Sequence, residues 1–219
     1  MEIKIYDFLE KNKCEELVKK LQTCDLWQDG KLTTGTFLKD RKTNNELITG
    51  ELHQEILEIV FSNFYETKNI REEIFLDTFY NIILPPMVNK YNLGEHYGWH
   101  FDQTYMPDQQ GNLARMDYSY TIFLNDDYEG GELQIEDQSV KGKQGQIVIY
   151  DNKLRHRVTK ITEGTRYACV GWIQSLIQDV EVRKRLGVSQ KLLSETENRD
   201  SPLLIELQKT HNLLLKKFS

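Results

Sequence analysis

Residues 91–102 read Y-N-L-G-E-H-Y-G-W-H-F-D, and this stretch decides how the rest of the chain is interpreted. Side chains at positions i and i+2 of a β-strand leave the same face, so His100 and Asp102 point the same way if the stretch is extended. An imidazole and a carboxylate on one face form half of a metal site. We expect the second histidine from a distant segment, and His156 in L-R-H-R-V is the well-placed candidate.

Two His and one Asp together form a facial triad, the usual seat of a non-haem Fe(II) ion that activates oxygen. On spacing alone a second interpretation stays open, in which two ordinary histidines lie beside a turn aspartate. A zinc site of the HExxH type needs a helix and a glutamate after the first histidine. Tyr97 follows His96 instead, and Gly98 among aromatic residues indicates a strand, so we reject the zinc motif.

The composition of the chain excludes several classes of protein. It has 219 residues and a net charge of −6, with 39% apolar and 28% charged residues. This length suits one domain with appendages, and an acidic balance argues against a nucleic-acid partner. No apolar run reaches the length of a membrane span, and the first residues lack the pattern of a signal peptide, so we expect a cytoplasmic protein. The three cysteines show no CxxC spacing and are expected to be reduced.

Periodicity predicts helices before the motif and strands around it. Apolar residues recur at helical spacing over 9–24 and 51–65, and residues 3–8 alternate like a weak strand. Residues 27–48 are polar, which suggests one or two strands joined by a long loop that is either a lid or a surface excursion. Short strands separated by turn residues, typical of a sandwich or jelly-roll barrel, are expected near 88–92, 98–103, 117–125, 131–136, 146–150, 156–161 and 165–173. Residues 176–186 and 202–218 are charged, leucine-bearing and helical.

A turn at residues 162–164 affects where Arg166 points. If Thr162, Glu163 and Gly164 form a three-residue hairpin loop, Ile161 pairs with Thr165. His156, Val158 and Arg166 then share one face, and the arginine can bind a carboxylate in the same pocket. Gly164 at the last loop position, where positive φ is needed, favours this register over a two-residue loop.

The spacing of these residues resembles that of a known enzyme family. The pattern consists of Tyr91, Gly94, Tyr97-x-x-His100-x-Asp102, G-G-E-L at 130–133, Gly145-x-Ile147-Val148, and His156-x-Val158 followed by Arg166 and Trp172. It resembles the Fe(II)- and 2-oxoglutarate-dependent dioxygenases of the prolyl 4-hydroxylase type. D-G-K-L-T-T-G at 29–35, W-I-Q-S-L-I-Q-D at 172–179 and the helical tail extend the resemblance to bacterial PKHD-type hydroxylases.

The resemblance implies an α+β fold whose core is a double-stranded β-helix, with N-terminal helices packed on it and a C-terminal helical tail. It implies His100, Asp102 and His156 as iron ligands and Arg166 as the clamp for the far carboxylate of 2-oxoglutarate. Tyr91 matches a pocket tyrosine that contacts the co-substrate, and Val158 lies beside the same pocket. Trp172 matches an aromatic that closes the pocket, although a plain core tryptophan is the alternative.

Two departures from the family pattern concern the substrate and the co-substrate. Several relatives place a tyrosine where this chain has Phe123, so the polar contact to the far carboxylate is expected from Ser119 or Thr121, which share its face by alternation. Collagen-type enzymes carry lysine at the position of Arg166, which weakens a collagen-like substrate. Glu95 and Glu132 lie at turns and receive no catalytic role.

The predicted function is hydroxylation of a C–H bond, foremost in a prolyl residue of a peptide or protein, with release of succinate and CO2. The alternatives are a hydroxylase of a free amino acid or small metabolite and a non-catalytic cupin-like metal-binding module. Fe(II), 2-oxoglutarate and O2 are implied, with ascorbate as an additional reductant. Residues 1–175 are expected to form the dioxygenase domain, with its β-helix core at about 75–175, and residues 176–219 a helical extension. The leucine-bearing helix at 202–218 either contributes a homodimer contact or packs against the barrel. The 28–48 and 103–115 loops are expected to frame the substrate mouth.

Overall fold

The structure is a computed structural model that describes residues 3–108, 110–197 and 200–219. Its first part contains β1 (Lys4–Asp7), α1 (Lys11–Thr23), β2 (Trp27–Asp29), the 3-10 helices η1 (Gly30–Thr33) and η2 (Thr36–Arg41), β3 (Asn45–Leu47), α2 (Glu51–Tyr65), α3 (Lys68–Thr78) and β4 (Tyr80–Ile83). The strands that follow are β5 (Met87–Tyr91), β6 (Tyr97–His100), β7 (Tyr105–Pro107), β8 (Leu113–Arg115), β9 (Tyr118–Phe123), β10 (Glu129–Gly130), β11 (Leu133–Ile135), β12 (Gln138–Val140), β13 (Gln146–Asp151), β14 (His156–Val158), β15 (Ile161–Glu163) and β16 (Arg166–Ser175). Helices α4 (Val180–Glu195) and α5 (Pro202–Phe218) come after them.

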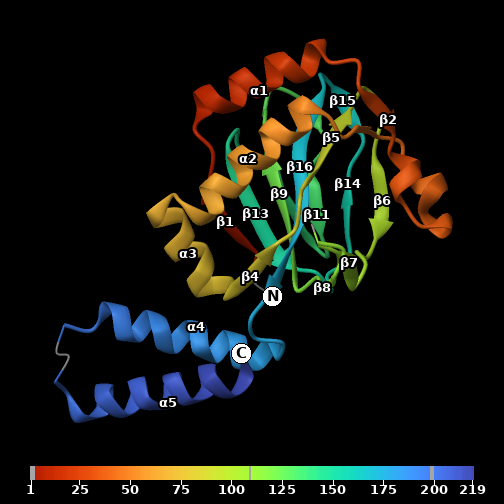
Figure 1. The fold of residues 1–219 in the computed structure, drawn as a ribbon. Coiled ribbons are helices and arrows are strands. Elements are labelled where there is room, and N and C mark those ends of the chain that lie inside the picture. The colour runs from red at the N-terminus through yellow and green to blue at the C-terminus, as the bar shows by residue number, and fades with distance from the viewer. Residues whose placement is uncertain (1–2, 109, 198–199) are drawn as a thin grey trace.

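Two antiparallel sheets face each other and form the β core (Figure 1). The larger sheet has the order β1-β13-β9-β16-β5-β3-β2, with β4 also paired to β16, and the smaller sheet has the order β12-β11-β14-β6. Two short ladders, β7–β8 and β10–β15, complete the described strands. This arrangement is the jelly-roll expected from the sequence, because neighbours in each sheet are mostly distant in the chain.

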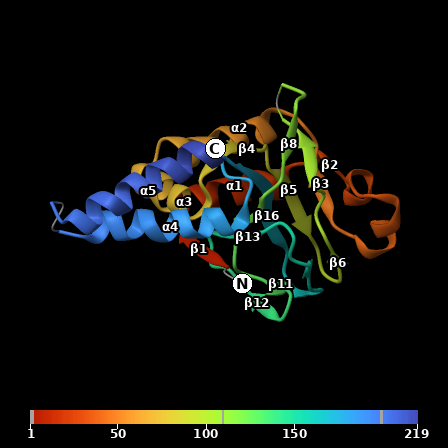
Figure 2. The ribbon, with the colours of Figure 1, turned by 90° about the horizontal axis from the view of Figure 1, so that it is seen from below.

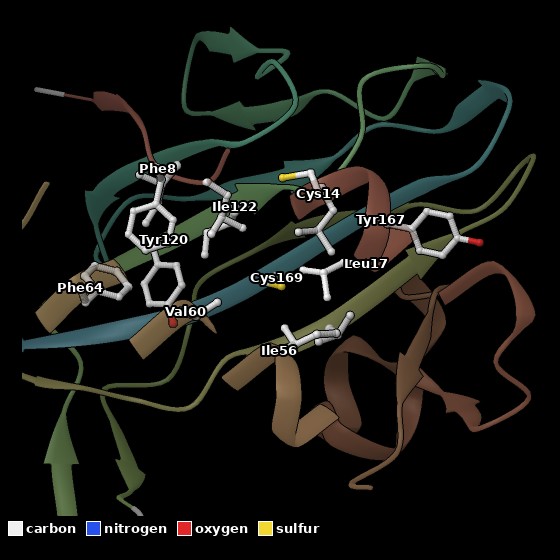
Figure 3. Close-up of a cluster of buried hydrophobic side chains, with 14 of the residues drawn as sticks. Phe8, Cys14, Leu17, Ile56, Val60, Phe64, Tyr120, Ile122, Tyr167 and Cys169 are labelled. Atoms are coloured by element: carbon white, nitrogen blue, oxygen red, sulfur yellow. The ribbon is translucent and has the colours of Figure 1, made fainter. Parts of the chain in front are cut away.

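Alternation along the strands of the larger sheet separates two environments. On β9, Tyr120 and Ile122 face the N-terminal helices and belong to the main hydrophobic core, whereas Phe123 packs with residues of the smaller sheet. Helices α1 and α2 cover the outer face, where Leu17 and Val60 are fully buried among the strands (Figure 3). The inner face of the same sheet is therefore left for polar side chains and the site.

The predicted elements are largely confirmed. Each strand predicted from residue 88 onward overlaps a strand of the structure, and α1 and α2 match the predicted helices. Helix α3 was not predicted, and residues 27–48 contain η1 and η2 between β2 and β3 instead of a plain loop. Helix α4 begins at Val180, later than predicted, because the side chain of Asp179 accepts a hydrogen bond from the Val182 amide and caps the helix there.

The predicted hairpin at residues 162–164 is wrong. Strand β15 pairs with β10, where Ile161 faces Gly130, and β16 pairs with β4, β5 and β9. Gly164 does have the positive φ that was expected, +74°, but it carries the chain from the side of the smaller sheet into the larger one. A Cβ at this position would lie 2.9 Å from the carbonyl oxygen of Asp127, so the crossing leaves no room for a side chain.

Helices α4 and α5 pack against each other and extend away from the β core (Figure 2). Arg183 of α4 is buried and its Nη1 lies 3.0 Å from Oδ1 of Asp117, at the start of β9. Arg115 binds the other side of the same carboxylate, with Nη2 at 2.9 Å from Oδ2. Among the described residues, none of the helices combines the length and apolar character that crossing a bilayer requires.

Candidate active site

His100, Asp102 and His156 meet between the two sheets. His100 ends β6 and lies directly opposite His156 of β14 in the ladder, while Asp102 follows just after β6. The Nε2 atom of His100 lies 3.8 Å from Oδ1 of Asp102, and Nε2 of His156 lies 3.5 Å from Oδ2. One ligand atom from each residue lies within 4.8 Å of the others, which is the arrangement of a facial metal-binding triad.

Backbone carbonyl groups fix the orientation of both imidazoles. The Nδ1 atom of His100 lies 2.9 Å from the carbonyl oxygen of Gly98, and that of His156 lies 3.0 Å from the carbonyl oxygen of Leu154. A carbonyl oxygen only accepts, so Nδ1 carries the proton and Nε2 offers its lone pair to the triad. Burial, and then the neighbouring His156, lower the pKa of His100 to about 4, so this ring is neutral at neutral pH.

Asp102 is held by two hydrogen bonds to one oxygen. Ser119 Oγ donates to Oδ2 over 2.6 Å, and the indole Nε1 of Trp172 donates to the same atom over 2.9 Å. Ser119 and Thr121 were the two candidates for contact with the far carboxylate of a co-substrate; here the Ser119 hydroxyl donates to Asp102, and Thr121 lines the cavity. Trp172 does line the cavity, and its indole also orients Asp102 from the inner face of β16.

Arg166 lies on the inner face of the larger sheet, across the cavity from β14. Its side chain is fully buried, with the guanidinium carbon 5.3 Å from the ring centre of Tyr91 and 5.2 Å from that of Phe123. Its Nε, Nη1 and Nη2 atoms find no hydrogen-bond acceptor among the described residues. Gly131 makes room for it, since a Cβ there would lie 3.1 Å from Cδ of Arg166. Burial raises the pKa of the adjacent Tyr91 hydroxyl above its ordinary range.

The triad and Arg166 line one cavity of about 290 Å³. The sequence-predicted residues His100, Asp102, His156, Arg166, Tyr91, Thr121, Val158 and Trp172 line it, and Ser119 lies just behind Asp102. Although the predicted hairpin does not exist, His156 and Arg166 reach one cavity because they face each other from opposite sheets. The 28–48 and 103–115 segments both contribute to the lining, as expected of the segments that frame the mouth.

One wall of the cavity is apolar. It consists of Met87, Met106, Met116, Phe101 and Trp172, and Phe101 remains 60% exposed at the rim. Methionine and aromatic side chains adapt to apolar ligands of varied shape. Sequence reasoning did not identify the three methionines, because isolated methionines in strands and loops carry no pattern.

Another part of the lining is polar and was also not identified from sequence. Lys42 forms an ion pair with Glu46, and both side chains are almost fully buried although they line the cavity. Thr33 of η1 donates to Glu46 Oε2 over 2.7 Å and accepts from Lys42 Nζ over 3.2 Å. Tyr150, another lining residue that was missed, is fully buried, and burial raises its pKa far above the ordinary value.

Glu95 and Glu132 lie outside this lining. Glu95 accepts hydrogen bonds from the amide of Asn92 and the side chain of Asn45, and Glu132 accepts one from Ser139. Both carboxylates therefore order loops outside the cavity lining.

Comparison with known proteins places these features in a family. Residues 86–174 match the 2OG-Fe(II) oxygenase superfamily. A PKHD-type hydroxylase of Prochlorococcus marinus (strain NATL2A) is 32% identical over 225 residues, which cover 98% of each chain. A prolyl-4-hydroxylase of Pseudomonas putida has a similar fold, with a TM-score of 0.55 at 17% identity over 79% of this chain and 92% of that one. A prolyl hydroxylase of Trichoplax adhaerens, solved with a hypoxia inducible factor peptide fragment, gives a TM-score of 0.52 at 16% identity over 84% and 86%.

Proposed function

The chain belongs to the PKHD-type hydroxylases of the 2OG-Fe(II) oxygenase superfamily, and on that premise we propose that it hydroxylates a prolyl residue of a peptide or protein. In this reaction 2-oxoglutarate is oxidatively decarboxylated to succinate and CO2 while one oxygen atom enters a C–H bond of the substrate. The family implies Fe(II), 2-oxoglutarate and O2.

The observation that carries the proposal is the environment of Arg166. A fully buried guanidinium without an acceptor is unfavourable unless an anion completes its hydrogen bonds. It shares a cavity with a triad whose two imidazoles offer their Nε2 lone pairs and whose carboxylate is fixed by two donors. A dicarboxylate that binds a metal at one end and an arginine at the other fits this donor set.

We assign the residues the following roles. His100, Asp102 and His156 hold Fe(II), which supplies the activation of oxygen when it is bound. Arg166 binds the far carboxylate of 2-oxoglutarate, and Tyr91 and Thr121 line the space between that carboxylate and the metal. Ser119 and Trp172 keep Asp102 oriented, and Val158 excludes water from the side of the smaller sheet.

Two observations support a prolyl residue in peptide linkage as the substrate. Solved proteins with this fold include prolyl hydroxylases, one of them bound to a peptide fragment. The methionine wall offers an apolar surface to a pyrrolidine ring. A free amino acid or small metabolite remains the alternative substrate. A cupin-like binding module is disfavoured, because such a module needs no carboxylate clamp beside the metal.

The proposal is tested first by measuring succinate formation from 2-oxoglutarate with added Fe(II). The matched control is His156→Ala, which removes one proposed ligand; equal succinate from both proteins contradicts the oxygenase assignment. The second step incubates the enzyme with a peptide library and detects the gain of one oxygen atom by mass spectrometry. Modification confined to proline-free peptides contradicts the prolyl assignment while leaving the oxygenase intact.

Several finer expectations belong to the same proposal. Ascorbate as a reductant, the division at residue 175 between a dioxygenase domain and a helical extension, and a homodimer through the C-terminal helices all stay predictions. The dimer is supported by apolar side chains exposed on α4 and α5, namely Val188, Leu192, Leu203, Ile205 and Leu213.

A further inference from the structure

Lys42 and Glu46 form a charge-neutral unit within the cavity wall. Lys42 is 5% exposed and Glu46 is 2% exposed, and their ion pair is completed by Thr33, which bonds to both side chains. The Lys42 ammonium also lies 5.0 Å from the ring centre of Tyr97, which is stacked on His100. The unit therefore faces the same cavity as the triad.

The other charges of the cavity are already accounted for by the proposed function. Among the described lining residues, the remaining charged side chains are Asp102 and Arg166. Asp102 is assigned to the metal and Arg166 to the co-substrate. A substrate that enters the cavity therefore meets no uncompensated cation, because the single cation left, Lys42, is neutralised by Glu46.

A carboxylate that leaves water for such a cavity loses its hydration and gains no opposite charge. This loss is large for an isolated ion, whereas a secondary amide loses much less and finds donors and acceptors in a polar wall. The same cavity thus disfavours a free amino acid and accepts the same residue when its carboxylate is engaged in a peptide bond.

We propose that Glu46, by neutralising Lys42, makes this enzyme select a residue held in peptide linkage over one with a free carboxylate. The inference rests on the proposed function, and it names Lys42 and Glu46 as the specificity-determining pair. Substituting Glu46 by Gln leaves Lys42 uncompensated while an amide oxygen still accepts its hydrogen bond. The cavity then gains one positive charge and should attract a carboxylate.

The test uses two probes that differ by one charge, N-acetyl-L-proline and N-acetyl-L-proline methylamide. Their dissociation constants are measured by ligand-observed NMR on the anaerobic complex of the protein with 2-oxoglutarate and Mn(II), a redox-stable substitute for Fe(II). We expect the wild type to bind the neutral methylamide at least about tenfold more tightly, a modest effect for a charge transferred without a partner. Glu46→Gln should lower this preference about tenfold or reverse it, since an uncompensated cation then faces the probe.

Two further variants separate charge from structure. Lys42→Met leaves the anion of Glu46 alone and should strengthen the preference for the methylamide, so it has the opposite sign and tests the inference even if Glu46→Gln folds poorly. The double variant Lys42→Met/Glu46→Leu is again neutral and should select like the wild type. Glu129→Gln, which breaks an exposed ion pair with Lys141, is the matched control and should change nothing.

The outcomes distinguish the role of Lys42 and Glu46 from the proposed function. A wild type that prefers the free acid, or a preference that stays within twofold in both single variants, overturns the role of Lys42 and Glu46 and leaves the oxygenase assignment intact. Failure of the wild type to bind 2-oxoglutarate with Mn(II) contradicts the proposed function instead.

Discussion

At the scale of single residues, Arg166 is expected to destabilise the ligand-free protein and to strengthen the binding of 2-oxoglutarate. Its guanidinium lies between two aromatic faces, with no acceptor among the described residues. Arg183 is also buried but differs in its surroundings, because it forms an ion pair with Asp117 and its Nη1 donates a hydrogen bond to the carbonyl oxygen of Ile177. The same substitution is therefore expected to change stability in opposite directions at the two positions.

Replacing Arg166 by Met should stabilise the ligand-free protein by about 1 kcal/mol, because a buried charge without an acceptor is removed. The same change should weaken 2-oxoglutarate binding about 100-fold, through the loss of two charge-assisted hydrogen bonds. Thermal unfolding with and without 2-oxoglutarate and Mn(II) measures both effects. Arg183→Met is the control and should lower the melting temperature; a similar loss in Arg166→Met contradicts this account.

Trp172 is expected to act on the metal through Asp102. Trp172→Phe keeps an aromatic ring in the cavity and removes the N–H that donates to Oδ2. Metal affinity should fall about 10- to 100-fold, as is typical when a partner of a ligating carboxylate is lost. Trp27→Phe is a matched control, since it removes an indole hydrogen bond to the Cys24 carbonyl oxygen and Trp27 does not line the cavity. Equal Mn(II) affinities in the two variants would be the contrary result.

The predictable residues are those whose side chains carry their own chemistry. A histidine and an aspartate at i and i+2 indicate a metal site from sequence alone. In the same way, an arginine among apolar residues indicates a site for an anion. The hydrogen bond from Ser119 to Asp102 was not predicted, because alternation along a strand indicates the face of a side chain but not its partner. Lys42 and Glu46 gave no signal, since a lysine and a glutamate in a polar loop are usually solvated.

At the scale of elements, the 30–44 segment contacts β6 and the residue before it, whereas β3, which follows, pairs with β2 and β5. A hydrogen bond of 2.8 Å joins the hydroxyls of Thr34 and Tyr97, and Thr43 bonds to His96 through backbone and side chain. The segment lies beside β6 at the right of Figure 1. Because β6 ends in His100, the same strand holds both this cavity-lining segment and one residue of the triad.

Tyr97→Phe should loosen this segment without disturbing the triad. The ring that stacks on His100 at 3.7 Å is retained, while the bond to Thr34 is lost. A loss of about 1 kcal/mol corresponds to roughly fivefold faster local opening, so trypsin should cut after the exposed Lys39 and Arg41 about fivefold faster. Tyr105→Phe, in an exposed strand, serves as control. Unchanged cleavage in Tyr97→Phe would mean that the segment is held by its other contacts.

The hairpin predicted at residues 162–164 was wrong because strand pairing is not determined by local sequence preferences alone. Residues 156–173 contain the expected strands and the expected positive φ at Gly164, and a hairpin satisfies every local preference. In a jelly-roll, strands adjacent in the chain pass to opposite sheets, and this pairing depends on residues such as Gly130 that lie far away in sequence. The inference of a shared pocket survived because the two sheets face each other.

At the scale of the whole molecule, the α4–α5 pair is fastened to the β core at one end and exposes apolar side chains elsewhere. Asp117 joins Arg183 of α4 to Arg115 of β8, so the attachment lies next to the β7–β8 ladder. Leu203 and Leu213 of α5 are 80% and 69% exposed. Exposed leucines gathered on one helix pair are typical of an interaction surface.

If these helices form the homodimer, Leu203→Glu/Leu213→Glu should convert the protein to a monomer, because two charges would be buried in the interface. Light scattering coupled to size-exclusion chromatography measures the mass of both proteins. Leu113→Glu, on β8 and 74% exposed, is the control and should leave the mass unchanged. A wild type that is already monomeric at high concentration contradicts the dimer.

The placement of the triad and Arg166 on different sheets has one further consequence. The two histidines belong to β6 and β14, whereas the arginine belongs to β16, and packed sheets keep a spacing of about 10 Å that single side chains scarcely alter. With the roles proposed above, the gap between the sheets acts as a ruler for the carbon chain of the dicarboxylate. Oxaloacetate, one carbon shorter than 2-oxoglutarate, would leave one of its ends short, so the architecture itself selects which central metabolite the enzyme consumes.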